Sequence, residues 1–240
     1  VNALVSDAGI LSKAAVEGKL ATRADAMKHQ GDFRKIIQGV NDTLDSVIGP
    51  LNVAAEYIDR IAKGDNPNKI TDNYNGDFNE IKNNINLCID ELNVMVNSLD
   101  EMNKSQKEGD IEARCKTEGL SGIYKTLITG TNEALDAVTL PVLEGIGLIN
   151  EYAEGKLSKE MRDLPGKQII LTKGLNSIRN NIKMLFSDTQ MLAQSAVEGK
   201  LAMRADAMKH QGDYRAIIQG FNDTLDAVIG PLNIAAEYVD

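Results

Sequence analysis

The sequence predicts an all-α protein, built as a tandem array of helix–connector–helix units that repeat about every 45 residues. Two residue types mark the repeat. A glycine recurs at Gly18, Gly64, Gly109, Gly155 and Gly199. An asparagine recurs at Asn41, Asn86, Asn132, Asn176 and Asn222. From each asparagine to the next glycine there are always 23 residues, whereas the distance from a glycine to the next asparagine varies between 21 and 23.

The constant interval predicts an unbroken helix that joins neighbouring units. Each residue added to a helix rotates everything after it by about 100°, so a helix with a buried face cannot change length freely. A loop tolerates such changes at little cost. The variable interval therefore contains the connector.

The first helix of each unit is expected to end at the glycine, which suits a left-handed helix C-cap. Its apolar residues lie 3, 7, 10 and 14 positions before the glycine; in the second unit they are Ile61, Tyr57, Ala54 and Pro50. This spacing is typical of a narrow coiled-coil stripe. Other residue types interrupt the stripe at Gln106, Gly145 and Thr189.

A connector of about a dozen residues follows the glycine. Six residues after the glycine lies a mostly apolar position, which we expect to pack against the helices: Ala24, Ile70, Cys115, Met161 and Ala205. Antiparallel helices need only a few linking residues, so this longer connector predicts two helices that run in the same direction.

The connector ends at a second glycine: Gly31, Gly76, Gly122, Gly166 and Gly212. An aspartate follows in three units (Asp32, Asp77 and Asp213), and Ile123 and Lys167 take its place in the other two. An anion stabilises a helix N-terminus, by capping it or by offsetting its dipole. We favour this role over paired catalytic acids, because there is one aspartate per unit.

The second helix is anchored on the asparagine. Apolar residues lie five before it and three and six after it, and this stripe is shifted by about one residue from the stripe of the next unit. Such a phase shift allows a junction to pack in two ways. We expect the asparagine to be structural, by bonding the connector or by fixing the register of the bundle, rather than a surface residue.

Residues 14–59 and 195–240 are almost the same sequence, 181 residues apart, with eight differences. The array therefore shows the start of a larger, four-unit repeat.

Composition excludes several classes of function. The net charge of −9 argues against nucleic acid or an anionic membrane as the main partner. Cys88 and Cys115 are expected to be small buried apolar residues. His29 and His210 are expected to be exposed connector residues, neither phosphate acceptors nor metal ligands. No catalytic, cofactor-binding or metal-binding constellation is predicted, and no enzyme activity.

Together these motifs resemble tandem HAMP domains, the poly-HAMP arrays of bacterial and archaeal chemoreceptors (methyl-accepting chemotaxis proteins) and sensor histidine kinases. The family's hydrophobic-Asn pair is present as Val40-Asn41, Ile85-Asn86, Leu175-Asn176 and Phe221-Asn222, with Thr131-Asn132 as a variant. Pro50, Pro141 and Pro231 resemble the proline that often opens the family's first helix.

The resemblance implies an elongated array of parallel four-helix coiled-coil bundles, each formed by a homodimer that contributes two helices per chain. A single unit can hardly bury its own stripes, so the sequence also favours a dimer. The predicted units are 1–48, 49–93, 94–139, 140–183 and 184–229, with 230–240 as the start of a sixth.

The resemblance also implies the function: a relay of conformational change between an input (sensor) domain and a kinase-controlling output domain of the same chain. A structural rod, spacer or filament is the alternative, and a partner-binding scaffold is a third. The chain opens without Met and ends inside a motif, so we expect a piece of a longer protein. Its expected location is the cytoplasm, with an inner-membrane anchor for the parent protein left open.

Overall fold

The computed structural model describes residues 1–238, and this part of the chain is all helix and connector, with no strand. The all-α fold class is therefore confirmed. The long helices are α1 (Asn2–Val16), α2 (Asp32–Ala62), α3 (Gly76–Lys107), α4 (Gly122–Ala153), α5 (Ile169–Val197) and α6 (Gly212–Glu237). Short 3₁₀ turns lie at Ala26–Lys28 (η1), Gly166–Gln168 (η2) and Ala207–Lys209 (η3). The last two residues of the predicted sixth unit at 230–240 lie outside the described residues.

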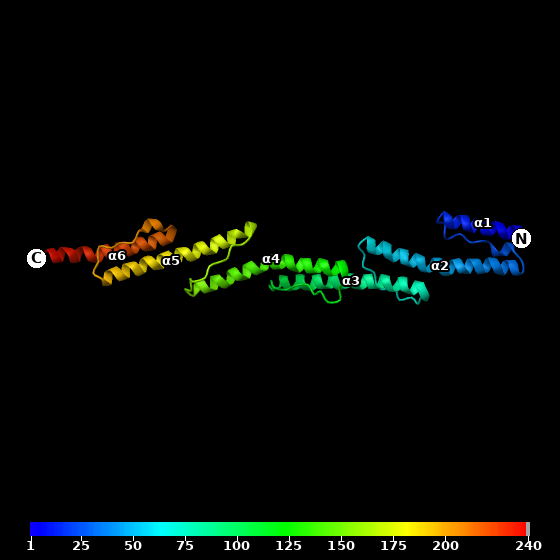
Figure 1. The fold of residues 1–240 in the computed structure, drawn as a ribbon, viewed down its shortest axis with the longest axis horizontal. Coiled ribbons are helices and arrows are strands. Elements are labelled where there is room, and N and C mark those ends of the chain that lie inside the picture. Colours follow the sequence, from blue (N-terminus) through cyan, green and yellow to red (C-terminus); the bar gives the residue numbers. More distant parts are fainter. Residues whose placement is uncertain (239–240) are drawn as a thin grey trace. The chain divides into compact units, whose positions relative to one another are not determined.

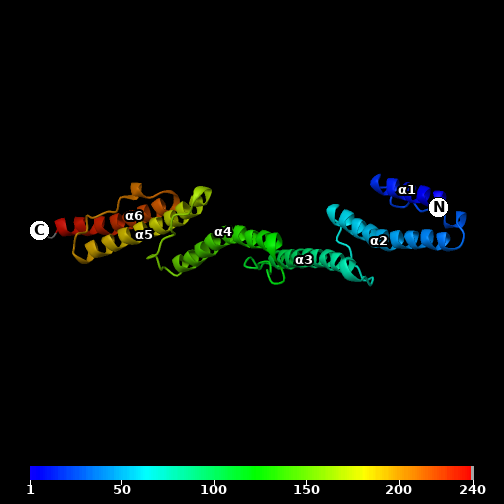
Figure 2. The ribbon, with the colours of Figure 1, turned by 45° about the vertical axis from the view of Figure 1, so that its right-hand side comes forward.

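The chain forms two compact units, Val1–Asn132 and Glu133–Asp240. Each connector turns back along the helix it has left, and the next helix starts again in the original direction (Figures 1 and 2). Consecutive helices joined by a connector therefore run parallel, as the length of the connector predicted.

The invariant 23-residue interval is one continuous helix in each case. Helix α2 extends through Asn41 to Ala62, and α3 extends through Asn86 to Lys107. Helices α4 and α5 likewise contain Asn132 and Asn176 and end just before the next glycine. The second helix of each unit is thus also the first helix of the following one.

The glycine after each first helix ends it in the left-handed conformation. At Gly64 φ is +82°, and the five repeated glycines all have positive φ. The amide of Gly64 donates to the Ile61 carbonyl and that of Asp65 to the Arg60 carbonyl, each at 2.9 Å. These two bonds form a Schellman motif, which satisfies carbonyls at the helix end.

The acids after the second glycine lie in the first helical turn, but they do not cap it. The side chain of Asp32 is 90% exposed and forms an ion pair with Lys35 at 3.1 Å. The N-cap residue Gly31 has no side-chain hydrogen bond to offer. Of the two roles considered for this acid, the interaction with the helix dipole fits its position.

The three prolines lie inside helices and open none of them. Pro50 is within α2, Pro141 within α4 and Pro231 within α6. Proline lacks the amide that would bond four residues back. Each of the three is the second residue of a predicted unit, so it lies where two predicted units share one helix.

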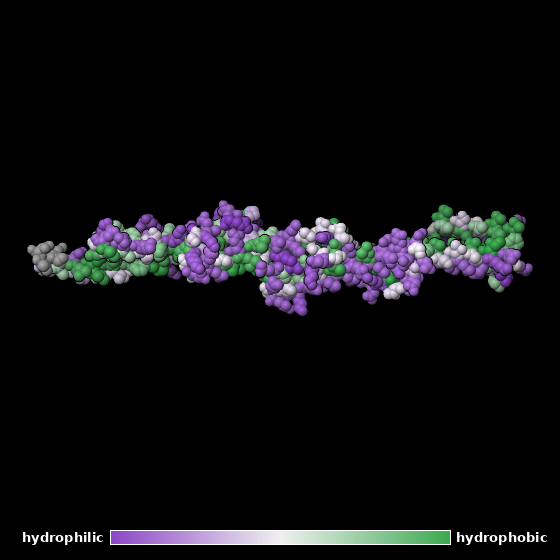
Figure 3. Space-filling view, turned by 60° about the horizontal axis from the view of Figure 1, so that its bottom comes forward, coloured by the Kyte–Doolittle hydropathy of each residue, from purple (hydrophilic) through white to green (hydrophobic). Residues whose placement is uncertain are grey.

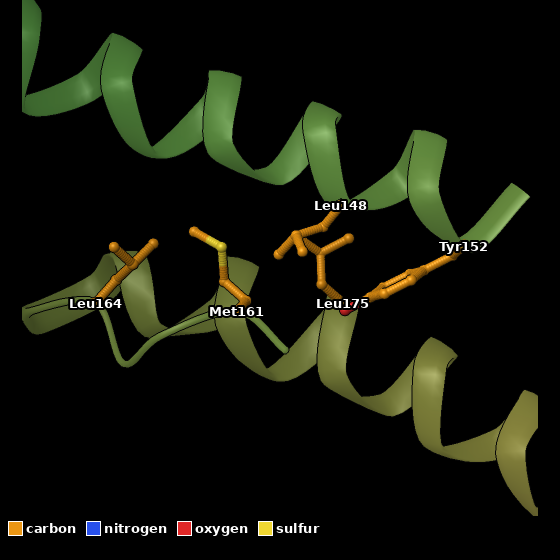
Figure 4. Close-up of a cluster of buried hydrophobic side chains, with 5 residues drawn as sticks. All are labelled: Leu148, Tyr152, Met161, Leu164 and Leu175. Carbon is orange, nitrogen blue, oxygen red and sulfur yellow. The ribbon is translucent and has the colours of Figure 1, made fainter. Parts of the chain in front are cut away.

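Each hydrophobic core combines a first helix, a connector and a second helix. The cluster in Figure 4 joins Leu148 and Tyr152 of α4, Met161 and Leu164 of the connector, and Leu175 of α5. A second cluster joins Ala54 of α2 and Ile70 of the connector to Ile85 and Ile89 of α3. A third joins Leu192 of α5, Ala205 of the connector and Ile218 of α6. The position six residues after the glycine thus supplies a core residue, as expected.

Much of the apolar stripe is exposed to solvent in the single chain. Ile36, Val40 and Val47 of α2 are 48%, 39% and 42% exposed. Figure 3 shows hydrophobic residues gathered on the surface of α1 and α2, at the N-terminal end. Within the described residues, no helix has both the length and the hydropathy needed to cross a membrane.

We expect Gly64→Ala to destabilise the array by about 1 kcal/mol, because an L-residue is strained at positive φ. Gly39→Ala is the matched control. Gly39 lies inside α2, and a Cβ there would meet no atom within 4 Å. Alanine should therefore stabilise the helix at that position by about 0.5–1 kcal/mol. Chemical unfolding measures both effects, and equal effects would contradict the C-cap role.

Candidate functional site

The repeated asparagine fastens the connector to the second helix in every unit. In the second unit, Oδ1 of Asn86 accepts the Ile70 amide at 2.8 Å and Nδ2 donates to the Ile70 carbonyl at 3.0 Å. The same two bonds join Asn41 to Ala24, Asn132 to Cys115, Asn176 to Met161 and Asn222 to Ala205, at 2.8–3.1 Å. We call this pair of hydrogen bonds the asparagine clasp.

The clasp gives hydrogen-bond partners to backbone groups that are buried with the connector. Ile70, Met161 and Ala205 are at most 6% exposed, so their backbone polar groups are shielded from water. An unpaired buried amide or carbonyl costs free energy comparable to a lost hydrogen bond. An asparagine side chain offers one donor and one acceptor, and so satisfies both groups at once. The connector is thereby held at a fixed height along the second helix.

A charged pair lies next to the clasp in the first, second and fifth units, and Arg114 and Asp136 occupy the same two positions in the third. Arg23 pairs with Asp45 at 2.6 Å, Lys69 with Asp90 at 2.7 Å, and Arg204 with Asp226 at 2.6 Å. The cation is five residues after the first glycine, and the aspartate four after the asparagine. This regular spacing is visible in the sequence and would have predicted the pair.

The fourth unit replaces this pair with a buried arginine. Arg179 takes the position held by leucine or isoleucine in the other units, and it is 8% exposed. Its guanidinium donates to the carbonyls of Leu157 at 2.8 Å and Ser158 at 3.2 Å. It also lies 3.4 Å from the Glu160 carboxylate. These contacts satisfy a charge that would be costly if buried alone.

The two histidines are buried, and the expectation that they are exposed is wrong. His29 is 6% and His210 2% exposed. Nε2 of His29 lies 2.6 Å from the Asp7 carboxylate of α1, and Nε2 of His210 lies 2.7 Å from Asp188 of α5. Nδ1 of His210 is buried without a hydrogen-bond partner. The partners are 22 residues apart in sequence, a spacing that no helical or connector pattern reveals.

The two cysteines differ in their surroundings. Cys115 is buried as expected, with Sγ 3.4 Å from Sδ of Met102, and burial raises the pKa of its thiol. Cys88 is only partly buried, and its Sγ lies 3.5 Å from the Tyr124 hydroxyl. Within residues 1–238, no group of three or more His, Cys, Asp or Glu side chains could hold a metal ion.

The structure places the singled-out residues at separate points of each unit. The first glycine ends the first helix, and the asparagine lies on the second helix, bonded to the connector. The prolines lie at the junctions, and the first-turn acids lie at the helix starts.

We expect Asn86→Ala to destabilise the array by about 2–3 kcal/mol, because the amide and carbonyl of Ile70 both lose their partner. Asn86→Asp should cost at least as much, because a carboxylate keeps the acceptor but sets a charged oxygen against the Ile70 carbonyl. Exposed Asn84→Ala on the same helix is the control. Chemical unfolding and hydrogen exchange at the Ile70 amide measure the effects. Unchanged exchange at Ile70 would show that the clasp does not hold the connector.

The His210–Asp188 pair can be tested with leucine, which stands at the histidine position in the third and fourth units as Leu120 and Leu164. We expect His210→Leu alone to cost about 2 kcal/mol, because Asp188 loses its partner. The double variant Asp188→Val/His210→Leu should recover about 1 kcal/mol or more of that loss in a double-mutant cycle. Additive effects would mean that the pair does not interact.

Two family models match this chain over regions that contain clasp asparagines. The HAMP domain model matches residues 28–94 and 209–240. The model of HAMP N-terminal domain 3 matches residues 144–183. Together they cover more than half of the sequence and include four of the five clasp asparagines. The chain therefore belongs to the HAMP domain family and carries HAMP domains in tandem.

Proposed function

We propose that this array relays conformational change from a sensor domain to a kinase-controlling output domain, within a chemoreceptor or sensor histidine kinase. HAMP domains are non-catalytic signal-relay modules of sensor proteins. The observation that carries the proposal is that each junction is a continuous helix with two apolar stripes at different angles.

Helix α2 illustrates how a junction can transmit motion. Its N-terminal half carries the stripe of Ile36, Val40 and Val47, and its C-terminal half carries Ala54, Tyr57 and Ile61, which pack in the second unit. At 100° per residue the two stripes are roughly 50° apart around the helix axis. Rotation of α2 in one unit therefore changes the face presented in the next.

The clasp couples the two helices of a unit through their connector. It ties each connector to the second helix, while the connector packs on the first helix through its buried residue. A change in one helix is then passed to the other, and two alternative packings of the stripes would supply the two states of a switch.

We further propose that the array works as a parallel homodimer. Stripe residues in both compact units are exposed in the single chain, including Leu127 at 55%, Ile217 at 44% and Val228 at 57%. A second copy in the same register would cover them with an identical stripe, as in a coiled coil. Apolar burial of this kind is the main favourable contribution to association.

A rod or spacer is the second candidate, favoured by the near-duplication of residues 14–59 and 195–240. Duplication of whole units is a direct way to lengthen a rod. The two candidates differ in which property of α2 matters: a relay depends on helical phase and a spacer depends on length.

Two insertions after Val47, tested in the full-length parent protein, separate phase from length. One extra residue rotates the rest of α2 by about 100° with little lengthening. Seven residues lengthen it by about 10 Å and return it nearly to phase. We expect the single insertion to abolish or invert kinase control and the seven-residue insertion to preserve most of it. Output that follows length instead would support the spacer.

Disulfide cross-linking tests the dimer. In a chain without its native cysteines, Val47→Cys should form an intermolecular disulfide, because the same position of both protomers faces the bundle. Lys35→Cys, at an 81% exposed side chain on another face of α2, is the control. We expect fast cross-linking at position 47 only, and a dimeric mass in sedimentation. A monomer at micromolar concentration would overturn the parallel homodimer.

A further inference from the structure

The N-terminus of α4 is held by a carboxylate from another helix. Glu91 of α3 accepts the Ser121 amide at 2.9 Å and the Ser121 hydroxyl at 2.5 Å. Ser121 immediately precedes α4, and its carbonyl accepts the Lys125 amide at 3.2 Å, which places it at the N-cap. Glu91 is only 6% exposed. The carboxylate is therefore a built part of the structure rather than a surface charge.

The third unit lacks the acid that other units place in this turn. Ile123 replaces the aspartate found at Asp32, Asp77 and Asp213. In a capping box, an acid three residues into a helix accepts the amide of the N-cap residue. Tyr124 takes that position in α4, so the helix has no such acid of its own. Glu91 supplies this capping hydrogen bond from α3, and it also brings the negative charge that the aspartate provides in the other units.

A second contact joins the same two helices. The Tyr124 hydroxyl lies 3.5 Å from Sγ of Cys88. Cys88 and Glu91 are three residues apart, so they share one face of α3. Helix α3 therefore touches the first turn of α4 at two points.

In the fourth unit, a side chain just before the new helix also contacts the preceding helix, at the position that corresponds to Glu91. Nε2 of Gln168 donates to the Ala137 carbonyl of α4 at 2.9 Å. Ala137 lies five residues after Asn132, as Glu91 lies five after Asn86. These two units are also the ones that lack the first-turn aspartate, with Ile123 and Lys167 in its place.

We propose that Glu91 is a positioning residue: it replaces the missing first-turn acid of the third unit and links α3 directly to the start of α4. Building on the proposed relay, the third unit then receives motion of α3 by this link as well as through its connector. The two hydrogen bonds from Ser121 lower the pKa of Glu91. The side chain is thus a carboxylate at neutral pH, the form that favours a helix N-terminus.

The first test is hydrogen exchange in the intact array, at the amides of residues 121–127. Glu91→Ala should increase exchange there about 5- to 10-fold, and Glu91→Gln less, because an amide oxygen still accepts. Exposed Glu80→Gln on the same helix is the control. Adding Ile123→Asp to Glu91→Ala should restore protection by returning the acid to α4. Unchanged exchange in Glu91→Ala would overturn the proposal.

The second test separates the link from simple helix capping, in the full-length parent protein. Glu91→Ala/Ile123→Asp should keep α4 protected yet still show altered kinase control, because α3 and α4 are no longer joined. Native output in this variant would overturn the link. The one-residue insertion after Val47 is measured in the same assay. If that insertion leaves the output unchanged, the proposed relay is wrong. The hydrogen-exchange data then still decide whether Glu91 holds the N-terminus of α4.

Discussion

The fold of each unit depends on the two hydrogen bonds between its asparagine and the backbone of the buried connector residue. These bonds satisfy polar groups that burial of the connector would otherwise leave unpaired. They also explain which lengths can vary. From the glycine to the clasped residue there are always six positions, and from the asparagine to the next glycine always 23. The separation between clasped residue and asparagine is 17, 16, 17, 15 and 17. All length variation thus falls in the loop that the clasp closes.

Around this constant clasp the units differ in their buried polar contacts. The first and fifth carry a His–Asp pair, where the third and fourth have leucine at the histidine position. The third depends on Glu91 at the start of α4, and the fourth buries Arg179. Such contacts are costly when broken and favour one packing over others. Five units that share the same clasp can therefore differ in the packing state they prefer, as the proposed relay requires.

Regular spacing predicted the features that repeat, and it missed those that do not. The asparagine and glycine counts predicted continuous helices, left-handed helix ends and parallel neighbours. The buried connector position was also visible, because Ile70, Cys115 and Met161 recur at one offset from the glycine. His29 and His210 were placed on the surface, because a polar residue in a connector is usually solvated. Their partners Asp7 and Asp188 lie on another helix, so only the folded chain shows the pairs.

The sequence by itself determined the local backbone. Each repeat needs a glycine that can adopt positive φ and a helix of constant phase. Both constraints act within a short stretch of chain, so both appear as regular patterns in the sequence. The tertiary structure decided which polar side chains meet. Glu91 and Ser121 are 30 residues apart, and their contact depends on how the connector brings α4 back beside α3. Sequence spacing does not predict such a contact, because no periodic pattern relates the two residues that form it.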